Sequence, residues 1–209
     1  MDVTARRGRG TSPDPFEELR DAIAADPANA AFTGQGWRPL LTGSPSSRVV
    51  IVSQAPGRRA QESGIPFHDA SGDRLVQWLG VTRAEFDDVS RFAIVPMDFY
   101  YPGKGASGDL PPRRGVAETW HPRAFSLMAP RLTILVGAYA QRHHLGDRRA
   151  STLTETVRGW RDYGPGLIPI VHPSPLNVGW QLRNPWFEEE LVPDLQRRVA
   201  AALGSSAEG

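Results

Sequence analysis

Residues 48–57 read RVVIVSQAPG, and this stretch contains the pattern that decides the fold. An unbroken run of apolar, mostly β-branched side chains leads directly into a polar Ser-Gln pair and a Pro-Gly turn. Such a run is typical of a strand that is buried on both faces, as in a parallel sheet. Similar runs recur in Phe92–Pro96, Leu132–Gly137 and Leu167–His172. We therefore predict four parallel strands, the first of them Arg48–Ser53.

Helical patterns lie between and after these runs. They cover Ser71–Leu79, Val116–Met128, Ala138–Leu145 and Ser151–Trp160. Thr152 and Glu155 have the spacing of a capping box, which supports the last of these helices. Asn184–Pro185 provide a cap and a first-turn proline for a closing helix that runs to about Leu203, and Pro193 should kink or restart it. The alternation predicts an α/β protein with three layers, α/β/α, around a central four-stranded parallel sheet.

Length and composition indicate one folded domain. The chain has 209 residues, of which 40% are hydrophobic, and a chain of this size buries roughly 70% of its unfolded surface. No internal repeat is visible. Residues 1–12 and 204–209 contain mostly small and polar side chains. We expect them to be disordered tails around a single domain of residues 13–203.

Composition also excludes several kinds of site. The absence of cysteine rules out disulfides, thiolate zinc sites, Cys-ligated iron–sulfur clusters and a cysteine nucleophile. The five histidines are scattered along the sequence, so we expect no metal and no cofactor. A net charge of +1 does not by itself indicate a polyanionic partner. No stretch approaches the ~20 apolar residues of a membrane span, and we expect a cytoplasmic monomer, in a bacterial-type cytosol or nucleoid, with no membrane partner.

Parallel sheets bind ligands where the chain leaves the carboxyl ends of the strands. The loops that follow the predicted strands there are residues 53–59, 64–72, 98–104 and 172–177. All are rich in proline, glycine and polar side chains. We therefore look for the functional residues in these four loops.

Each loop feature, taken alone, has a structural as well as a functional interpretation. The Pro-Gly turn of residues 53–57 either is a plain connection or presents backbone N–H groups to an anion or a carbonyl oxygen. Phe67 either plugs its loop or stacks on a nucleic-acid base. His172 either is structural or stabilises developing negative charge with a hydrogen bond. Leu176, at the tip of a Pro-Ser-Pro loop, is placed like the apolar wedges that enter a base stack.

Three motifs in order, SQAPG, GIPFHDASG and HPSPLN, resemble the uracil-DNA glycosylase superfamily. Residues 53–72 are most similar to family 4, the thermostable iron–sulfur enzymes, and residues 172–177 resemble the leucine loop of family 1. The resemblance covers roughly residues 45–203 and extends to the expected order of strands. It implies a DNA repair hydrolase of base excision repair. Such a monofunctional glycosylase cuts the N-glycosidic bond of a flipped-out uracil, or a related deaminated base, and leaves an abasic site.

The resemblance implies roles for individual residues. Two would be catalytic, His172 and Gln54. His172 would donate a hydrogen bond to the O2 atom of the base, which gains charge as the bond breaks. The backbone of Gln54, together with the backbone of Ala55, would contact the O2 side of the base. Phe67 would stack on the uracil, and Leu176 would fill the gap in the duplex. The residues that would bind DNA are Arg58, Ser174, Pro175, Leu176, Asn177 and Arg183. The implied partner is DNA that contains uracil or another deaminated base.

The sequence also departs from the family pattern. Ala55 stands where family 1 enzymes have a carboxylate, although family 4 members also have alanine or glycine there. The asparagine that reads the uracil edge has no obvious counterpart in residues 95–103, and Asp98 is the candidate substitute. The carboxylates available to assist water or to stabilise the sugar cation are Glu62, Asp69 and Asp98. The iron–sulfur ligands of family 4 are absent.

Two other functions are compatible with these residues. A non-catalytic binder of damaged or single-stranded nucleic acid would have kept the pocket after losing an acidic group at Ala55. A hydrolase of free nucleotides or nucleosides would use the same pocket, but it would leave the Leu176 loop without a role. Cleavage of a uracil-containing oligonucleotide after alkali treatment separates the glycosylase from the binder.

Overall fold

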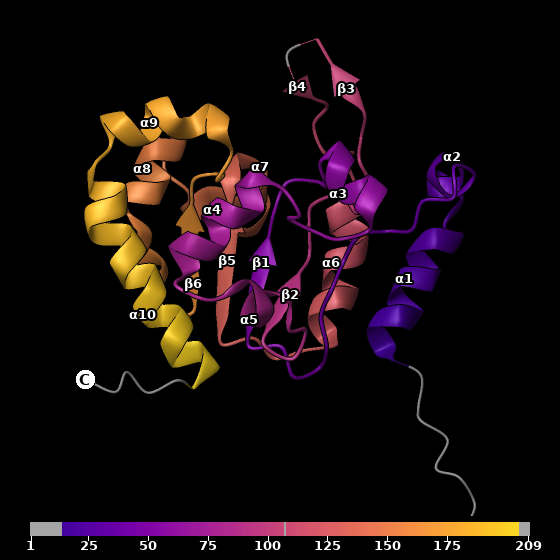
Figure 1. Cartoon of the computed structure of the whole chain (residues 1–209), viewed down its shortest axis with the longest axis horizontal. Helices are drawn as coiled ribbons and strands as arrows, with labels where there is room; N and C mark the ends of the chain where they lie inside the picture. The colour runs from indigo at the N-terminus through magenta and orange to yellow at the C-terminus, as the bar shows by residue number, and fades with distance from the viewer. Residues whose placement is uncertain (1–13, 107, 205–209) are drawn as a thin grey trace, which may run out of the picture.

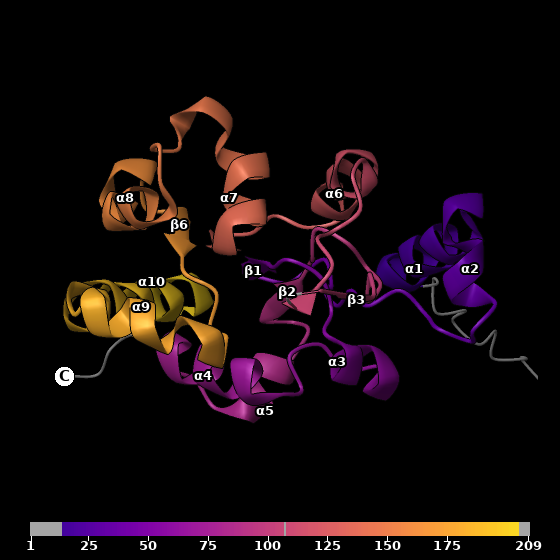
Figure 2. The ribbon, with the colours of Figure 1, turned by 90° about the horizontal axis from the view of Figure 1, so that it is seen from above.

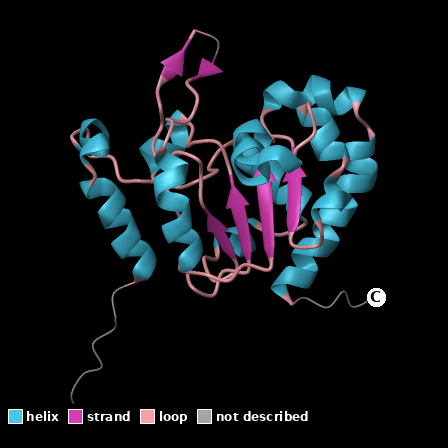
Figure 3. Ribbon diagram, turned by 180° about the vertical axis from the view of Figure 1, so that it is seen from behind, coloured by secondary structure: helices cyan, strands magenta, loops and turns pink. Residues whose placement is uncertain are grey.

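Four parallel strands form the centre of the fold, and the computed structural model describes residues 14–106 and 108–204 around them (Figure 1). In spatial order the strands are β2 (Phe92–Ile94), β1 (Val49–Val52), β5 (Leu132–Val136) and β6 (Leu167–Ile170). Their arrows all point the same way in Figure 3. The predicted α/β fold with a central four-stranded parallel sheet is therefore confirmed.

Helices cover both faces of this sheet and create the outer two layers (Figure 2). One face carries α1 (Pro15–Ala25), α6 (Val116–Ser126) and α7 (Gly137–Leu145). The other face carries α4 (Ala70–Leu79), α5 (Arg83–Asp87) and α10 (Val192–Leu203). A further helix, α8 (Leu153–Arg158), packs against the edge strand β6. Pro169 is tolerated within β6 because an edge strand can lack one ladder donor.

The side chains of β1 explain why two hydrophobic cores form. Successive side chains of a strand point to opposite faces of the sheet. Val49 and Ile51 pack into the core beneath α4 and α10, whereas Val50 and Val52 pack into the core beneath α1, α6 and α7. All four side chains are fully buried. A strand buried on both faces has no position for a polar residue, which is the origin of its unbroken apolar run.

Most of the predicted helices are present with shifted ends. In α8 the capping box is complete: Thr152 Oγ1 accepts the Glu155 N–H at 3.1 Å, and the Glu155 carboxylate accepts the Thr152 N–H at 3.1 Å. The helix is shorter than predicted, and a 3₁₀ helix, Trp160–Tyr163, follows it. The closing segment begins as a π-helix, Phe187–Leu191, before α10. Pro193 lies in the first turn of α10, where the π-helix changes to an α-helix while the backbone stays helical.

Several elements were not predicted. Four are helices of at most six residues: α2 (Ala30–Thr33), α3 (Arg58–Ser63), α5 and α9 (Val178–Arg183). Such short segments do not display a 3.6-residue periodicity. Two larger elements were also not predicted: α1, and a hairpin formed by β3 (Lys104–Gly105) and β4 (Gly108–Asp109). Short 3₁₀ turns lie elsewhere in the chain, at Pro27–Asn29, Gly146–Arg148 and Pro175–Asn177. The hairpin is antiparallel and projects from the end of the molecule toward which the sheet strands point (Figure 3).

The predicted tails lie outside the described residues, with one exception. Gly204 has a left-handed backbone, with φ of 76°, and caps the end of α10. None of the helices in residues 14–106 and 108–204 has both the length and the apolar character that a membrane crossing needs.

Candidate active site

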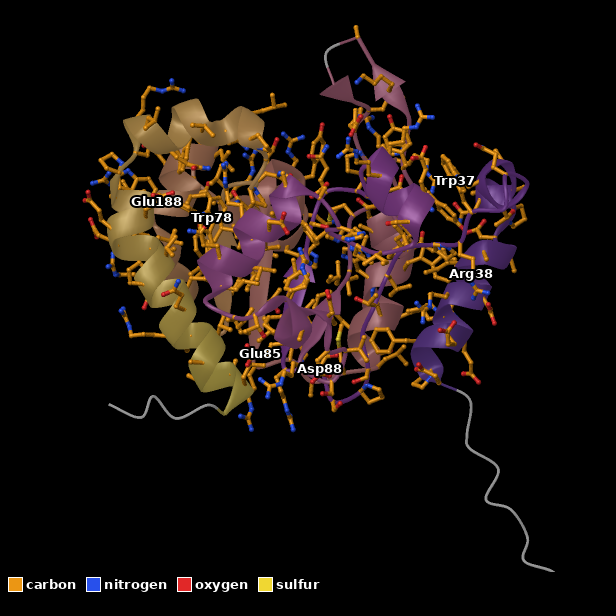
Figure 4. All side chains as sticks on the ribbon, in the orientation of Figure 1. Trp37, Arg38, Trp78, Glu85, Asp88 and Glu188 are labelled. Atoms are coloured by element: carbon orange, nitrogen blue, oxygen red, sulfur yellow. The ribbon has the colours of Figure 1, made fainter. Side chains whose placement is uncertain are left out.

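A cavity of about 400 Å³ opens at the carboxyl ends of the strands. Its lining includes Ser53, which directly follows β1, and Pro96 and His172, which lie two residues beyond β2 and β6. Glu85 and Asp88 lie at the opposite edge of the molecule, where the strands begin (Figure 4). The cavity is therefore at the edge where parallel sheets bind ligands, as the sequence predicts.

The first motif forms one wall of the cavity. Gln54 and Ala55 both line it. The Ser53 carbonyl accepts the Met97 N–H at 2.9 Å, and the Gln54 carbonyl accepts the Asp98 N–H at 3.2 Å. These bonds tie the loop after β1 to the loop after β2. They hold the backbone of Gln54 and Ala55 in place at the cavity.

Phe67 lines the cavity from a strained backbone. Its φ is 56°, the one positive value among the non-glycine residues that the structure describes, and such a conformation costs ~1–3 kcal/mol. The Phe67 carbonyl accepts Arg83 Nη2 at 3.2 Å, and a Cβ built on Gly72 would lie only 1.7 Å from that oxygen. The ring packs edge-on against Phe86 with centroids 6.1 Å apart. Only glycine fits at residue 72, because any side chain there would collide with the Phe67 carbonyl. The Phe67 ring lies between Phe86 of the core and the cavity.

Asp69 is the N-cap of α4 and also lines the cavity. Its Oδ1 accepts the Gly72 N–H at 3.0 Å. Its Oδ2 would lie 3.8 Å from a Cβ built on Gly57, at the end of the first motif. One carboxylate oxygen thus stabilises the helix, while the other faces the wall formed by the first motif.

His172 has one ring nitrogen already engaged. Nδ1 accepts the Ser174 N–H at 3.2 Å, so the proton of the neutral ring resides on Nε2. Burial lowers the pKa of His172 below its ordinary value, and the Asp69 carboxylate offsets part of that shift. The ring is therefore a neutral N–H donor at neutral pH. Gly137, with φ of 83°, begins α7 next to it, and a Cβ there would lie 3.5 Å from His172 Cβ.

The rest of the HPSPLN loop holds itself together. Asn177 Nδ2 donates to the His172 carbonyl at 2.8 Å, and Ser174 Oγ accepts the Leu176 N–H at 3.3 Å. Ser174, Leu176 and Asn177 line the cavity, whereas Pro175 is exposed beside them. Leu176 is 90% exposed, as its position in the sequence predicts. Two polar side chains thus build the loop that presents an apolar tip to solvent.

The assignment of Asp98 to the base is wrong. The side chain is fully buried and does not line the cavity. Arg113 binds both of its oxygens, Nη2 to Oδ1 and Nε to Oδ2, each at 2.8 Å. The N–H groups of Arg113 and Tyr100 donate to the same carboxylate at 3.0 and 3.2 Å. A carboxylate with these partners is occupied in holding the loop and has no access to a base.

Several other residues singled out in the sequence lie outside the cavity. Arg58 is exposed and forms an ion pair with Glu62, with Nε 2.7 Å from Oε1. Arg183 is exposed at the end of α9. Of the three carboxylates considered from the sequence, only Asp69 reaches the cavity lining.

The hairpin contributes a part of the cavity that sequence reasoning missed. Gly108, Asp109 and Leu110 line the cavity from this side, beyond the predicted loop of residues 98–104, which contains the neighbouring lining residue Pro102. Asp109 Oδ1 accepts the Tyr101 hydroxyl at 3.2 Å. The Gly-rich segment GKGASGD was the available signal, because such a run is typical of a tight turn.

Three of the five histidines come together in space. His121, His143 and His144 each bring one ring nitrogen within 4.8 Å of the others. The expectation that the histidines lie too far apart to bind a metal together is therefore wrong. A metal-binding cluster can be assembled from helices that are far apart in the chain.

A family model, the Uracil DNA glycosylase superfamily, matches residues 41–196. The chain belongs to this superfamily. The match contains all four strands of the sheet and the three loop motifs. Members of the uracil-DNA glycosylase superfamily are hydrolytic glycosylases that act on DNA bases, and this coarse activity agrees with a cavity bordered by Phe67 and His172. The closer likeness of the first motif to family 4 stays a prediction.

Proposed function

We propose that this protein is a monofunctional glycosylase of base excision repair. It hydrolyses the N-glycosidic bond of a flipped-out uracil, or of a related deaminated base, and leaves an abasic site in DNA. The observation that carries the proposal is the neutral His172 ring, whose Nδ1 is engaged by Ser174 and whose remaining N–H is a donor at a cavity also lined by Phe67. The cavity, at about 400 Å³, is within the range of roughly 300–1,000 Å³ of small-ligand sites.

His172 and the first motif act on the leaving base. When the bond breaks, the pyrimidine leaves as an anion, and donors that meet O2 lower the barrier because they bind the transition state better than the substrate. His172 supplies one such donor. The backbone at Gln54 and Ala55 supports the O2 side of the base from the adjacent wall, and the Phe67 ring stacks on the base face.

Asp69 supplies the negative charge that Ala55 lacks. The sugar becomes cationic as the base leaves, and a nearby carboxylate stabilises it or orients the attacking water. Glu62 is paired with Arg58 and Asp98 with Arg113. Asp69 lines the cavity and has one oxygen beyond its capping bond. It is therefore our assignment for this role.

The DNA would lie across the open side of the cavity. Leu176 is almost wholly exposed at the tip of its loop and fills the hole that the flipped nucleotide leaves in the duplex. Ser174, Pro175 and Asn177 meet the backbone around that hole. Arg58 and Arg183 are exposed, and their charge attracts phosphates from outside the cavity.

A duplex oligonucleotide with a single uracil tests the proposal. We expect strand breaks after alkali treatment of the enzyme reaction, and none with an otherwise identical thymine oligonucleotide. Parallel duplexes with hypoxanthine and xanthine identify the preferred deaminated base. Gel retention of the uracil duplex without breaks would instead establish the non-catalytic binder that the loss of an acid at Ala55 allows. No breaks and no retention on any duplex or single strand would refute both.

A further inference from the structure

Three histidines gather on the face of the sheet that α6 and α7 cover. His121 lies in α6, and His143 and His144 lie in the last turn of α7. Figure 2 shows these two helices on the same side of the sheet. One nitrogen from each ring lies within 4.8 Å of the other two. None of the three lines the cavity described above.

Hydrogen bonding fixes which nitrogen of His121 is free to bind. Its Nε2 lies 3.0 Å from the Pro96 carbonyl oxygen. A carbonyl can only accept, so Nε2 carries the proton and Nδ1 has the lone pair. Nδ1 lies 3.0 Å from Nε2 of His144. Histidines that bind metals usually donate their other ring N–H to a backbone carbonyl or a carboxylate in this way.

Spacing and charge also suit a metal ion. The nitrogens of two histidines on a tetrahedral zinc ion lie about 3.3 Å apart, because each Zn–N bond is about 2.0–2.1 Å long. The 3.0 Å between Nδ1 of His121 and Nε2 of His144 is close to this spacing. Glu118 adds a carboxylate whose Oε1 is 3.6 Å from Nδ1 of His143.

We propose that His121, His143 and His144 form a structural site for a divalent transition-metal ion, with zinc as the ion of first choice. Imidazole nitrogen favours zinc, nickel and copper over magnesium and calcium. The ion ties α6 to α7. Through His121 it also braces the carbonyl of Pro96, a residue of the cavity lining. This inference does not depend on the glycosylase activity.

A metal-free explanation makes a different prediction. The rings of His121 and His144 stack with centroids 5.2 Å apart and planes 25° from parallel. A stacked, hydrogen-bonded pair could simply fill the space between the two helices. In that case His143 contributes no ligand, and the protein takes up no metal.

Cobalt and zinc titrations of the untagged full-length protein separate the two explanations. The protein is first stripped with a chelator and dialysed. We expect Co²⁺ to produce the visible absorbance of a nitrogen-ligated site, saturating at one ion per chain, and Zn²⁺ to abolish it. Mg²⁺ should have no effect. Calorimetry with Zn²⁺ and elemental analysis give the stoichiometry independently of the colour.

Variants locate the site. His143→Gln and His144→Gln should abolish stoichiometric uptake, whereas His68→Gln, which removes an exposed histidine outside the cluster, should not. Far-UV circular dichroism checks folding. If His144→Gln fails to fold, His143→Gln decides, because the His143 side chain is 24% exposed and its replacement disturbs the packing little. The rise in Tm that Zn²⁺ produces in the unaltered protein should vanish in the same variants. Absence of uptake at micromolar metal, or uptake unchanged in both cluster variants, would overturn the proposal.

Discussion

Replacement of His172 by alanine is the most direct test of the proposed chemistry. The ring supplies one N–H donor at the cavity, because Ser174 already engages its other nitrogen. Removal of one donor to a developing oxyanion costs ~2.7–4 kcal/mol, or roughly 10²–10³-fold in rate. A water molecule that enters the space left by the imidazole can replace part of the lost hydrogen bond. We therefore expect the lower end of that range, about 10²-fold.

Single-turnover kinetics on a uracil duplex measures this effect separately from binding. Affinity for DNA should change little, because the donor acts mainly on charge that forms in the transition state. His68→Ala is the matched control, since it removes an exposed histidine of the neighbouring loop that does not line the cavity. A His172→Ala rate within about threefold of the unaltered protein, which is less than about 0.7 kcal/mol, would refute the role of His172.

The same residue predicts the pH dependence. Burial lowers the folded-state pKa of His172 below 6.5, so the neutral donor form persists through neutral pH. As pH falls from 6.5 through the lowered pKa, the ring gains a proton on Nδ1 and loses the bond from Ser174. The rate should be flat above this window and decline within it. Stability falls in the same window, because the unfolded chain binds the proton more tightly. An identical acid decline of stability in His172→Ala would assign it to another group.

Four further variants test other assignments. Phe67→Ala should weaken capture of the extruded base by ~1–3 kcal/mol, and Phe67→Trp should restore part of it; a lower Tm with unchanged activity per folded molecule would make the ring a core plug. Leu176→Ala should slow uracil removal from duplex DNA, more opposite adenine than opposite guanine, and leave the single-stranded reaction nearly unchanged. The control Leu182→Ala alters an exposed leucine outside the cavity and should change neither reaction. Equal slowing by Leu176→Ala on duplex and single-stranded DNA would exclude the wedge role. Asp69→Asn keeps an oxygen for the Gly72 N–H, so it should lower the single-turnover rate roughly 10²-fold with little loss of Tm, and an unchanged rate would exclude Asp69 from the chemistry. Gly72→Ala places a Cβ 1.7 Å from the Phe67 carbonyl oxygen and should cost ~1–3 kcal/mol or more in denaturant unfolding, so an unchanged midpoint would contradict that close approach.

Local sequence determined the sheet and the exposed tip of the leucine loop. The four apolar runs predict buried strands because a strand that is covered on both faces needs an apolar side chain at every position. This pattern can be read from a few consecutive residues without knowledge of the rest of the fold. Leu176 could be placed at an exposed tip because two prolines restrict the short loop that carries it. Pro193 marks the point where the last helix changes from π to α, in keeping with the missing N–H of proline.

Tertiary structure decided which of the polar side chains are available. Asp98 and Asp69 have the same chemistry in the sequence, but Arg113 closes over Asp98 whereas Asp69 faces the cavity. The three clustered histidines come together only because α6 and α7 pack on the same face of the sheet. The hairpin that completes the cavity wall has no apolar pattern to reveal it. In each case the deciding contact joins segments that are separate in the chain, and the free energy of such a contact depends on packing that no local pattern encodes.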